Sequence, residues 1–137
     1  MNYRKANDYY YDYFPRDKRP LILSVQQENE GKFYKIPKVF FDKKGLFLHL
    51  SPEAKIIYSI ARDRQELANR FNDPEPDGRR PIYLTVQETM RILNCGNKKA
   101  IKVLKELEQW RLIARIRQGL NKPCKIYVRE VLQTDQT

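Results

Sequence analysis

The stretch Leu93–Val128 decides the fold of this chain, and it reads LNCGNKKAIKVLKELEQWRLIARIRQGLNKPCKIYV. A polar turn opens it, a segment with helical periodicity follows, and two short runs of β-forming residues end it. Nine Lys or Arg residues lie between residues 94 and 128 against only two Glu, so this stretch carries +7 of the chain's net charge of +10. Most of the excess positive charge therefore belongs to one predicted helix and one predicted hairpin.

The predicted helix that follows Gly96 has two different faces. Apolar residues recur at i, i+3, i+4 and i+7 spacing, which is typical of a helix packed on a core; they are Ala100, Val103, Leu104 and Leu107. The opposite face carries Lys98, Lys102, Lys105 and Gln109. We expect Asn97 to cap the helix, with Gly96 easing the tight turn before it. A lysine-rich face is often merely solvated, but these lysines meet no acid on their own face and a cationic hairpin follows.

The residues on either side of this helix predict its context. Thr85-Val86-Gln87-Glu88 is a capping box that predicts a helix through Leu93, so residues 85–109 form a helix-turn-helix. Strands are expected at 112–117 and 125–128, with a turn at 118–123. Leu112, Ala114 and Ile116 share one parity and are expected to face the core, which leaves Arg115 and Arg117 outward. Trp110 is expected to fill the core beneath the hairpin.

Further elements are predicted between the N-terminal region and this motif. Residues 33–41, FYKIPKVFF, predict an extended piece and a short helix from Pro37, with the aromatic residues in the core. Ser51-Pro52-Glu53 predicts the start of a helix that runs to about Phe71. Residues 72–80 form a loop whose acids are expected to be solvated, and 82–84 form a short strand. These elements complete an α+β fold, a winged helix-turn-helix with a β-hairpin wing.

The N-terminal region, residues 1–31, is predicted to be an arm and linker ahead of this fold. Aromatic residues crowd into it without a helical or alternating period: Tyr3, Tyr9, Tyr10, Tyr11, Tyr13 and Phe14. Residues 21–25 are expected to form a short strand. We favour a subunit contact for the tyrosines because tyrosine is enriched in interfaces, with base stacking and disorder as the alternatives. The domain itself is placed at 32–129, and 130–137 is a tail or a linker to a further domain.

Composition narrows the function. A length of 137 residues and a hydrophobic content of 41% fit one globular domain, and the net charge of +10 favours a polyanionic partner. No apolar run approaches the about 18 residues of a membrane span, and the charged N-terminus is unlike a signal peptide. We therefore expect a cytoplasmic protein in which Cys95 and Cys124 are reduced and partly buried. The residues hold no phosphate-binding loop, nucleophile motif or zinc pattern, so no enzyme activity, cofactor or metal is predicted.

Several blocks resemble the N-terminal domain of RepA-type replication initiators of low-copy plasmids in Gram-positive bacteria. They are FYKIPKVFF, LSPEAKIIYSIARDR, the capping-box helix and, most specifically, NKKAIKVLKELEQWRLIARIRQGLNKPCKIYV. Together they span residues 32–128. The resemblance implies a winged helix that binds direct repeats (iterons) in a plasmid replication origin, which typically lies within the initiator's own coding sequence. Asn121 stands where relatives often carry glycine, and asparagine tolerates the left-handed conformation that the turn requires.

The resemblance also implies partners beyond double-stranded DNA. It predicts a homodimer able to join two DNA segments, and a second, helical domain that recruits host replication proteins. Because that domain would follow Thr137, we expect this sequence to be a shortened form of a longer initiator.

The predicted DNA-binding residues belong to the helix and to the wing. They are Asn97, Lys98, Lys99, Lys102, Lys105, Arg115, Arg117, Gln118, Asn121, Lys122 and Lys125. The first turns of the helix are expected to reach base edges or flanking phosphates, and Lys105 a phosphate. The wing is expected to reach the backbone or the adjacent minor groove. Asn97 has two candidate roles, helix cap and bidentate contact to adenine, and the cap is favoured.

Two other functions are compatible with these residues. A winged-helix transcriptional regulator would bind a promoter operator with the same motif, because fold does not fix function. A protein-interaction module would bind DNA only incidentally, with steep salt dependence and no sequence preference.

Overall fold

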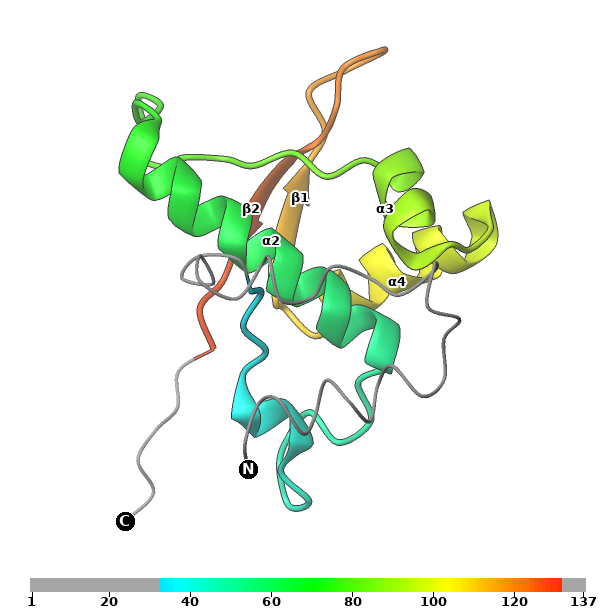
Figure 1. The fold of residues 1–137 in the computed structure, drawn as a ribbon. Coiled ribbons are helices and arrows are strands. Elements are labelled where there is room, and N and C mark those ends of the chain that lie inside the picture. Colours follow the sequence, from blue (N-terminus) through cyan, green and yellow to red (C-terminus); the bar gives the residue numbers. More distant parts are fainter. Residues whose placement is uncertain (1–32, 132–137) are drawn as a thin grey trace, which may run out of the picture. The chain divides into compact units, whose positions relative to one another are not determined.

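A computed structural model describes residues 33–131, and those from Tyr34 onward belong to one unit. Its elements follow in the order η3 (Lys38–Phe41), α2 (Pro52–Phe71), α3 (Val86–Leu93), α4 (Asn97–Gln109), β1 (Ile113–Ile116) and β2 (Lys125–Val128). In Figure 1, α3 and α4 lie together as a helix pair, and α2 crosses the β1–β2 hairpin. The predicted winged helix-turn-helix is therefore confirmed.

The long helix α2 begins where the sequence predicts. The Ser51 side chain accepts a hydrogen bond from the Ala54 N–H at 3.1 Å, Pro52 occupies the first turn, and Glu53 places an acid beside the positive end of the helix dipole. One face of α2 is buried, and it includes Ala54, Ile57, Tyr58 and Ala61. The Tyr58 hydroxyl donates to the Arg129 carbonyl oxygen at 2.7 Å, and burial raises the pKa of Tyr58 to about 12. This contact fastens the chain after β2 to the core.

The capping box of α3 is also confirmed. Glu88 N–H donates to the Thr85 hydroxyl at 3.0 Å, and the Glu88 carboxylate accepts from the Thr85 N–H at 3.5 Å. The helix ends at Asn94, which adopts the left-handed conformation with φ of 50°. Asparagine tolerates this conformation better than most residues, so the chain reverses into α4 within three residues.

The helix α4 ends in a turn that the sequence analysis did not predict. Arg111 is left-handed with φ of 60°, while Leu112 N–H donates to the Leu107 carbonyl at 2.9 Å and Arg111 N–H to the Glu108 carbonyl at 2.9 Å. This pair of bonds is a Schellman motif, in which glycine is the usual left-handed residue. The motif sends the chain directly into β1.

The hairpin has the predicted strands but a different burial pattern. β1 and β2 pair antiparallel from Ile113↔Val128 to Ile116↔Lys125, and residues 82–84 contribute only an isolated bridge, Ile82↔Ile126. Leu112 and Ile113 are both buried, whereas Ile116 is exposed, so the predicted parity is wrong. The reason is that β1 leaves the core as it proceeds: the hairpin loop that follows it projects beyond the helices in Figure 1, and Ile116 at the end of the strand is 42% exposed.

The segment before α2 differs from the prediction as well. η3 is a single four-residue 3-10 turn, and of its aromatic neighbourhood only Phe40 is buried, in edge-to-face contact with Phe47 at 5.1 Å and Tyr58 at 5.2 Å between ring centroids. Phe33, Tyr34 and Phe41 are exposed, because so short a turn directs one aromatic side chain inward. The predicted arm at 1–31, its strand at 21–25 and the tail from residue 132 lie outside the described residues.

The core joins α2, α4 and the hairpin. Its fully buried side chains include Phe40, Ile57, Tyr58, Leu104, Leu107 and Ile126. Trp110 is only partly buried and stacks beside Phe47 at 5.7 Å between ring centroids, so it borders the core instead of filling it. The buried face of α4, predicted from periodicity, is confirmed in full by Ala100, Val103, Leu104 and Leu107.

An ion pair between α2 and α3 predicts part of the acid sensitivity of the fold. Arg64 donates to both carboxylate oxygens of Glu88, at 3.2 and 2.8 Å, and this lowers the pKa of Glu88 below its usual value of 4.5. A carboxylate whose pKa is lower in the folded than in the unfolded state stabilises the fold at pH values above its unfolded-state pKa. This stabilisation is lost as the pH falls through the folded-state pKa. Glu88→Gln keeps a residue type suited to the capping box but removes this titration.

We therefore expect the melting temperature of Glu88→Gln to fall less than that of the parent between about pH 5 and about pH 3. Thermal unfolding followed by circular dichroism across this range measures the difference. Two curves that fall in parallel would show that the pair contributes nothing to acid stability.

Candidate nucleic-acid interface

Helix α4 is fixed by its apolar face and presents cations on the other. Lys98, Lys102 and Lys105 are exposed, and within the described residues none of the three makes an ion pair. Because lysine stems are long and flexible, three such side chains on successive turns can reach separate phosphates or base edges of one duplex. The predicted cationic face of α4 is thus present in the structure.

Asn97 does not cap this helix. The N-cap is Gly96, with φ of −81° and ψ of 176°, and no side chain makes a capping hydrogen bond there. The cap prediction is wrong because the tight turn after Asn94 places the first helical residue at Asn97 itself, one position later than a cap. The exposed Asn97 side chain is therefore free of the role that competed with base contact.

Lys99 stands apart from its neighbours because it has an acidic partner. Its ammonium lies 3.3 Å from the Glu53 carboxylate at the start of α2. A backbone N–H at the helix start, and then Lys99, lower the pKa of Glu53. The prediction that Lys99 contacts DNA did not take this pair into account, because Glu53 comes from another element and does not appear on a helical wheel of α4. A hollow between α2 and α4 is bordered by these two side chains together with Ser51, Lys98, Lys102 and Glu106.

Lys125, at the base of the wing, is also paired. Its ammonium contacts the Glu75 carboxylate, which accepts a second hydrogen bond from the Tyr127 hydroxyl at 2.9 Å. Lys125 holds the pKa of Glu75 below its usual value, and Glu75 in turn raises that of Lys125. Arg79 covers the Tyr127 ring at 4.1 Å from its centroid. The prediction of a solvated acidic loop is wrong for Glu75, which ties residues 72–80 to β2.

Of the remaining wing residues, some are held by contacts within the protein and others are exposed. Arg115 is partly buried and pairs with Glu108 of α4 at 2.8 Å, so it points back to the helix instead of outward. Arg117 and Lys122 are exposed, with no ion pair in the described part of the chain. Gln118 donates to the Pro123 carbonyl at 2.8 Å, across the neck of the loop. Asn121 has φ of 63°, which confirms its left-handed conformation.

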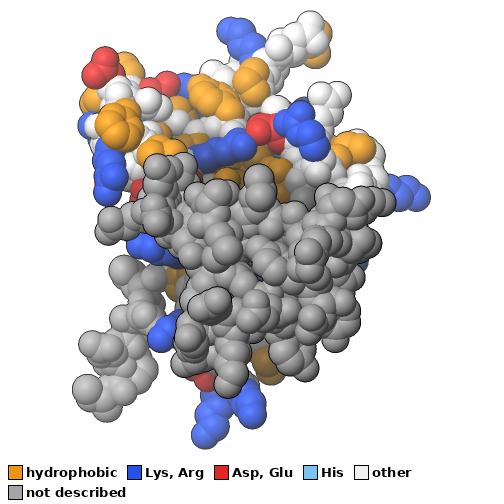
Figure 2. Space-filling view, viewed as in Figure 1, with side chains coloured by type: hydrophobic (Ala, Val, Ile, Leu, Met, Phe, Trp, Pro, Cys, Tyr) orange, Lys and Arg blue, Asp and Glu red, His pale blue; other side chains and the backbone are white. Residues whose placement is uncertain are grey.

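Among the cations predicted to bind DNA, those that are exposed and unpaired therefore lie on two surfaces, the outer face of α4 and the hairpin loop. Figure 2 shows Lys and Arg side chains in blue beside the hairpin loop and at the outer edge of the α3–α4 part of the molecule, while the tip of the loop is uncharged. The sequence identified the cations but missed their acidic partners Glu53, Glu75 and Glu108. Only the Glu108–Arg115 pair joins residues close in sequence, on either side of the predicted helix-to-strand turn, so it alone could have been predicted from the sequence.

Three comparisons with known proteins bear on this surface. Residues 32–137 match the family model described as the N-terminus of replication initiator protein A (RepA). The chain belongs to this family. The resemblance inferred from the sequence blocks is thereby confirmed for the RepA N-terminal domain.

Solved structures agree with the family model. A structure described as "N-Terminal domain of DNA binding protein" matches with a TM-score of 0.65 at 36% identity, over 81% of this chain and 84% of that one. One described as "Structure of Rep-DNA complex" matches with a TM-score of 0.65 at 36% identity, over 81% and 85%. A third, "Structure of MDR initiator", has a TM-score of 0.63 at 36% identity, over 81% and 87%.

A curated relative is longer than this chain. The "41 kDa protein" of Lactobacillus helveticus is 24% identical over 111 residues, which are 77% of this chain and 31% of the relative. The RepA N-terminal domain described here thus spans about a third of that protein's length.

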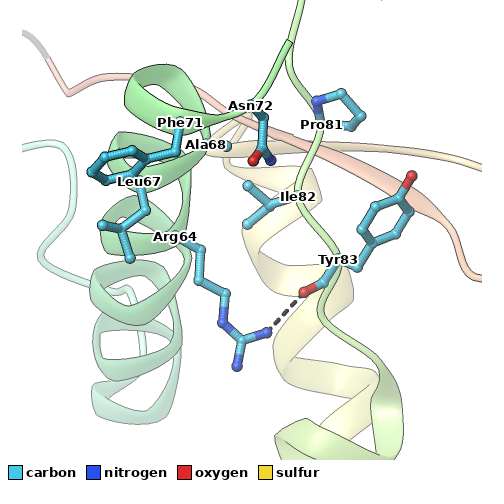
Figure 3. A pocket seen from close by; sticks show the side chains of 8 residues that line it. All are labelled: Arg64, Leu67, Ala68, Phe71, Asn72, Pro81, Ile82 and Tyr83. Atoms are coloured by element: carbon cyan, nitrogen blue, oxygen red, sulfur yellow. Dashed lines mark hydrogen bonds between the residues drawn. The ribbon is translucent and has the colours of Figure 1, made fainter. Parts of the chain in front are cut away.

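Outside this surface, the described part of the RepA domain has a further pocket and two cysteines. An apolar pocket lies between the end of α2 and residues 81–83, where Arg64 donates to the Tyr83 carbonyl at 2.8 Å (Figure 3). Among residues 33–131 no three His, Cys, Asp or Glu side chains cluster to hold a metal ion. No helix in the described part of the chain is long and apolar enough to cross a membrane. Cys95 and Cys124 are both free and half-buried.

Proposed function

We propose that this RepA N-terminal domain binds double-stranded DNA of a plasmid replication origin, with α4 in the major groove and the hairpin wing against the neighbouring backbone. The observation that carries the proposal is the exposed row Lys98, Lys102 and Lys105, which lies on the face of α4 opposite its buried side chains. Helix α3 supports α4 as the first helix of a helix-turn-helix supports the second. A structural neighbour described as a Rep–DNA complex adds support at 36% identity.

The proposal gives each residue a role according to its partners in the free protein. Asn97 and Lys102, on the first turns of α4, contact base edges, and Lys98 and Lys105 contact phosphates. Arg117, Asn121 and Lys122 approach the backbone from the wing. Four further residues were predicted to bind DNA and are held by contacts to other residues of the protein: Lys99, Arg115, Gln118 and Lys125. Their first role is to position the helix and the wing.

Three finer elements of the proposal rest on the RepA family. The DNA site consists of direct repeats in the origin, the protein binds as a homodimer able to join two DNA segments, and a further domain contacts host replication proteins. The aromatic arm at residues 1–31 is the proposed subunit contact. Each element is separable from DNA binding itself, because a single winged helix can bind one half-site.

Lys122 tests the wing. Lys122→Ala should weaken binding to repeat and scrambled duplexes by the same factor and lower the slope of log K against log salt by about 1, because one phosphate contact releases about one counterion. Lys43→Ala, which removes an equally exposed lysine ahead of α2, is the matched control and should leave the slope unchanged. Fluorescence anisotropy across a salt series measures both. An unchanged slope for Lys122→Ala would remove the wing from the interface.

A further inference from the structure

The tip of the hairpin carries a leucine that the fold leaves outside. Leu120 is 92% exposed, more than any other large apolar residue of the described chain. Neither β1 nor β2 packs against it, because strand pairing ends at Ile116↔Lys125 and the loop continues beyond. An exposed leucine on an ordinary surface loop needs no explanation. Here, however, it is the apex of an element that the proposed function brings to DNA.

The loop around Leu120 is held in shape by its own backbone. Gly119 has φ of 125° and Asn121 has φ of 63°, so the residues on both sides of the leucine adopt left-handed conformations. Lys122 N–H donates to the Gly119 carbonyl at 3.4 Å, and Gln118 closes the neck by donating to the Pro123 carbonyl at 2.8 Å. This geometry turns the chain sharply at Leu120 and directs its side chain away from the hairpin. A loop held in this way loses little backbone freedom on binding.

The charge around Leu120 indicates which kind of partner it meets. Arg117 and Lys122 flank it, both exposed, and residues 117–124 contain no acid. An apolar tip between cations fits the minor groove of DNA, where phosphates line both sides and an apolar side chain can insert between stacked base pairs. Proteins that bind there often insert Leu, Ile, Met or Phe between base steps, which unstacks the step and bends the duplex. A protein partner would have to be acidic around an apolar pocket.

We infer that Leu120 is an apolar wedge that enters the minor groove beside the site of α4 and contacts or partly unstacks one base step. This inference rests on the proposed DNA binding and adds a source of sequence preference to it. Pyrimidine–purine steps unstack most easily, so the wedge favours repeats with a TA or CA/TG step beneath the wing. The preference arises from DNA deformability, without any hydrogen bond to a base.

The test compares Leu120→Ala, Leu120→Met and Leu46→Ala with the parent protein. Leu46 is 80% exposed and lies in the segment before α2, at the end of the unit away from the hairpin loop, so it is a matched control (Figure 1). The DNA is a duplex of the direct repeats in which 2-aminopurine replaces adenine at one position at a time. Anisotropy gives affinity and salt slope, and 2-aminopurine fluorescence reports unstacking.

We expect Leu120→Ala to bind about tenfold more weakly with an unchanged salt slope, because the lost contact is apolar and carries no charge. Parent and Leu120→Met should raise 2-aminopurine fluorescence at one step beneath the wing, and Leu120→Ala should not. Leu46→Ala should match the parent in every measurement. Since Leu120 is outside the core, none of these differences should come with a lower melting temperature.

Two results would overturn the wedge while leaving DNA binding intact. The first is a Leu120→Ala variant that matches the parent in affinity and fluorescence. The second is a loss confined to duplexes that hold two copies of the protein, with normal affinity for a single half-site, which would assign Leu120 to a contact between proteins. A parent that binds no duplex would instead refute the proposed function itself, and the wedge with it.

Discussion

Replacing Lys98, Lys102 and Lys105 together by alanine should weaken binding to the repeat duplex by more than about 100-fold, because each lost contact is worth roughly 1 kcal/mol or more. The slope of log K against log salt should fall by about 2, since Lys98 and Lys105 each lose a phosphate contact and each such contact removes nearly one released counterion. All three side chains are exposed and alanine is the best helix former, so α4 should remain folded. Fluorescence anisotropy across a salt series measures affinity and slope.

A matched control separates this effect from net charge. Lys35, Lys38 and Lys43 are also exposed, and their replacement by alanine removes the same charge from the segment before α2. We expect this control variant to lose only a few-fold in affinity, through the general field of the protein. If both triple variants lose affinity equally, the binding is a non-specific effect of net charge, and α4 is not the interface.

Glu106→Ala should lower the free energy of unfolding by about 2–3 kcal/mol, because hydrogen bonds to charged groups are among the strongest in proteins. The Glu106 carboxylate of α4 accepts from the Ser51 N–H and from the Ser51 hydroxyl, both at 2.7 Å. Ser51 is in turn the cap of α2, so one carboxylate joins α4 to the start of the longest helix. In a domain of this size the loss corresponds to a melting temperature lower by about 10–20 °C.

The control for this variant is Glu66→Ala on the surface of α2. Glu66 lies 3.6 Å from Arg62 with a side chain that is 52% exposed, so its removal should cost less than about 0.5 kcal/mol. Thermal unfolding of both variants gives the comparison. Equal melting temperatures would show that the link between Ser51 and Glu106 does not stabilise the position of α4.

Local patterns predicted the elements that form the candidate site. The periodicity of Ala100, Val103, Leu104 and Leu107 defined the buried face of α4, and the capping signals at Ser51 and Thr85 placed the starts of α2 and α3. These signals are reliable because they depend on residues within one or two turns of each other. The left-handed Asn121 belongs to the same class.

Most of the errors arise from contacts that local patterns do not reveal. Glu53, Glu75 and Glu108 each hold a cation that the sequence assigned to DNA, and two of these pairs join residues 46 and 50 positions apart. Burial along β1 depends on where the core ends, which alternation alone does not reveal. The Asn97 cap failed by one position, because the turn from Asn94 leaves no room for a longer connection.

The most direct test of origin binding compares two duplexes in fluorescence anisotropy at several salt concentrations. One carries the direct repeats of this protein's own coding region, and the other has the same composition in scrambled order. We predict that the repeats are bound at least about 1,000-fold more tightly at physiological salt, as specific DNA-binding proteins bind their sites. Equal, salt-sensitive binding to both duplexes would contradict the proposal that this domain recognises a replication origin.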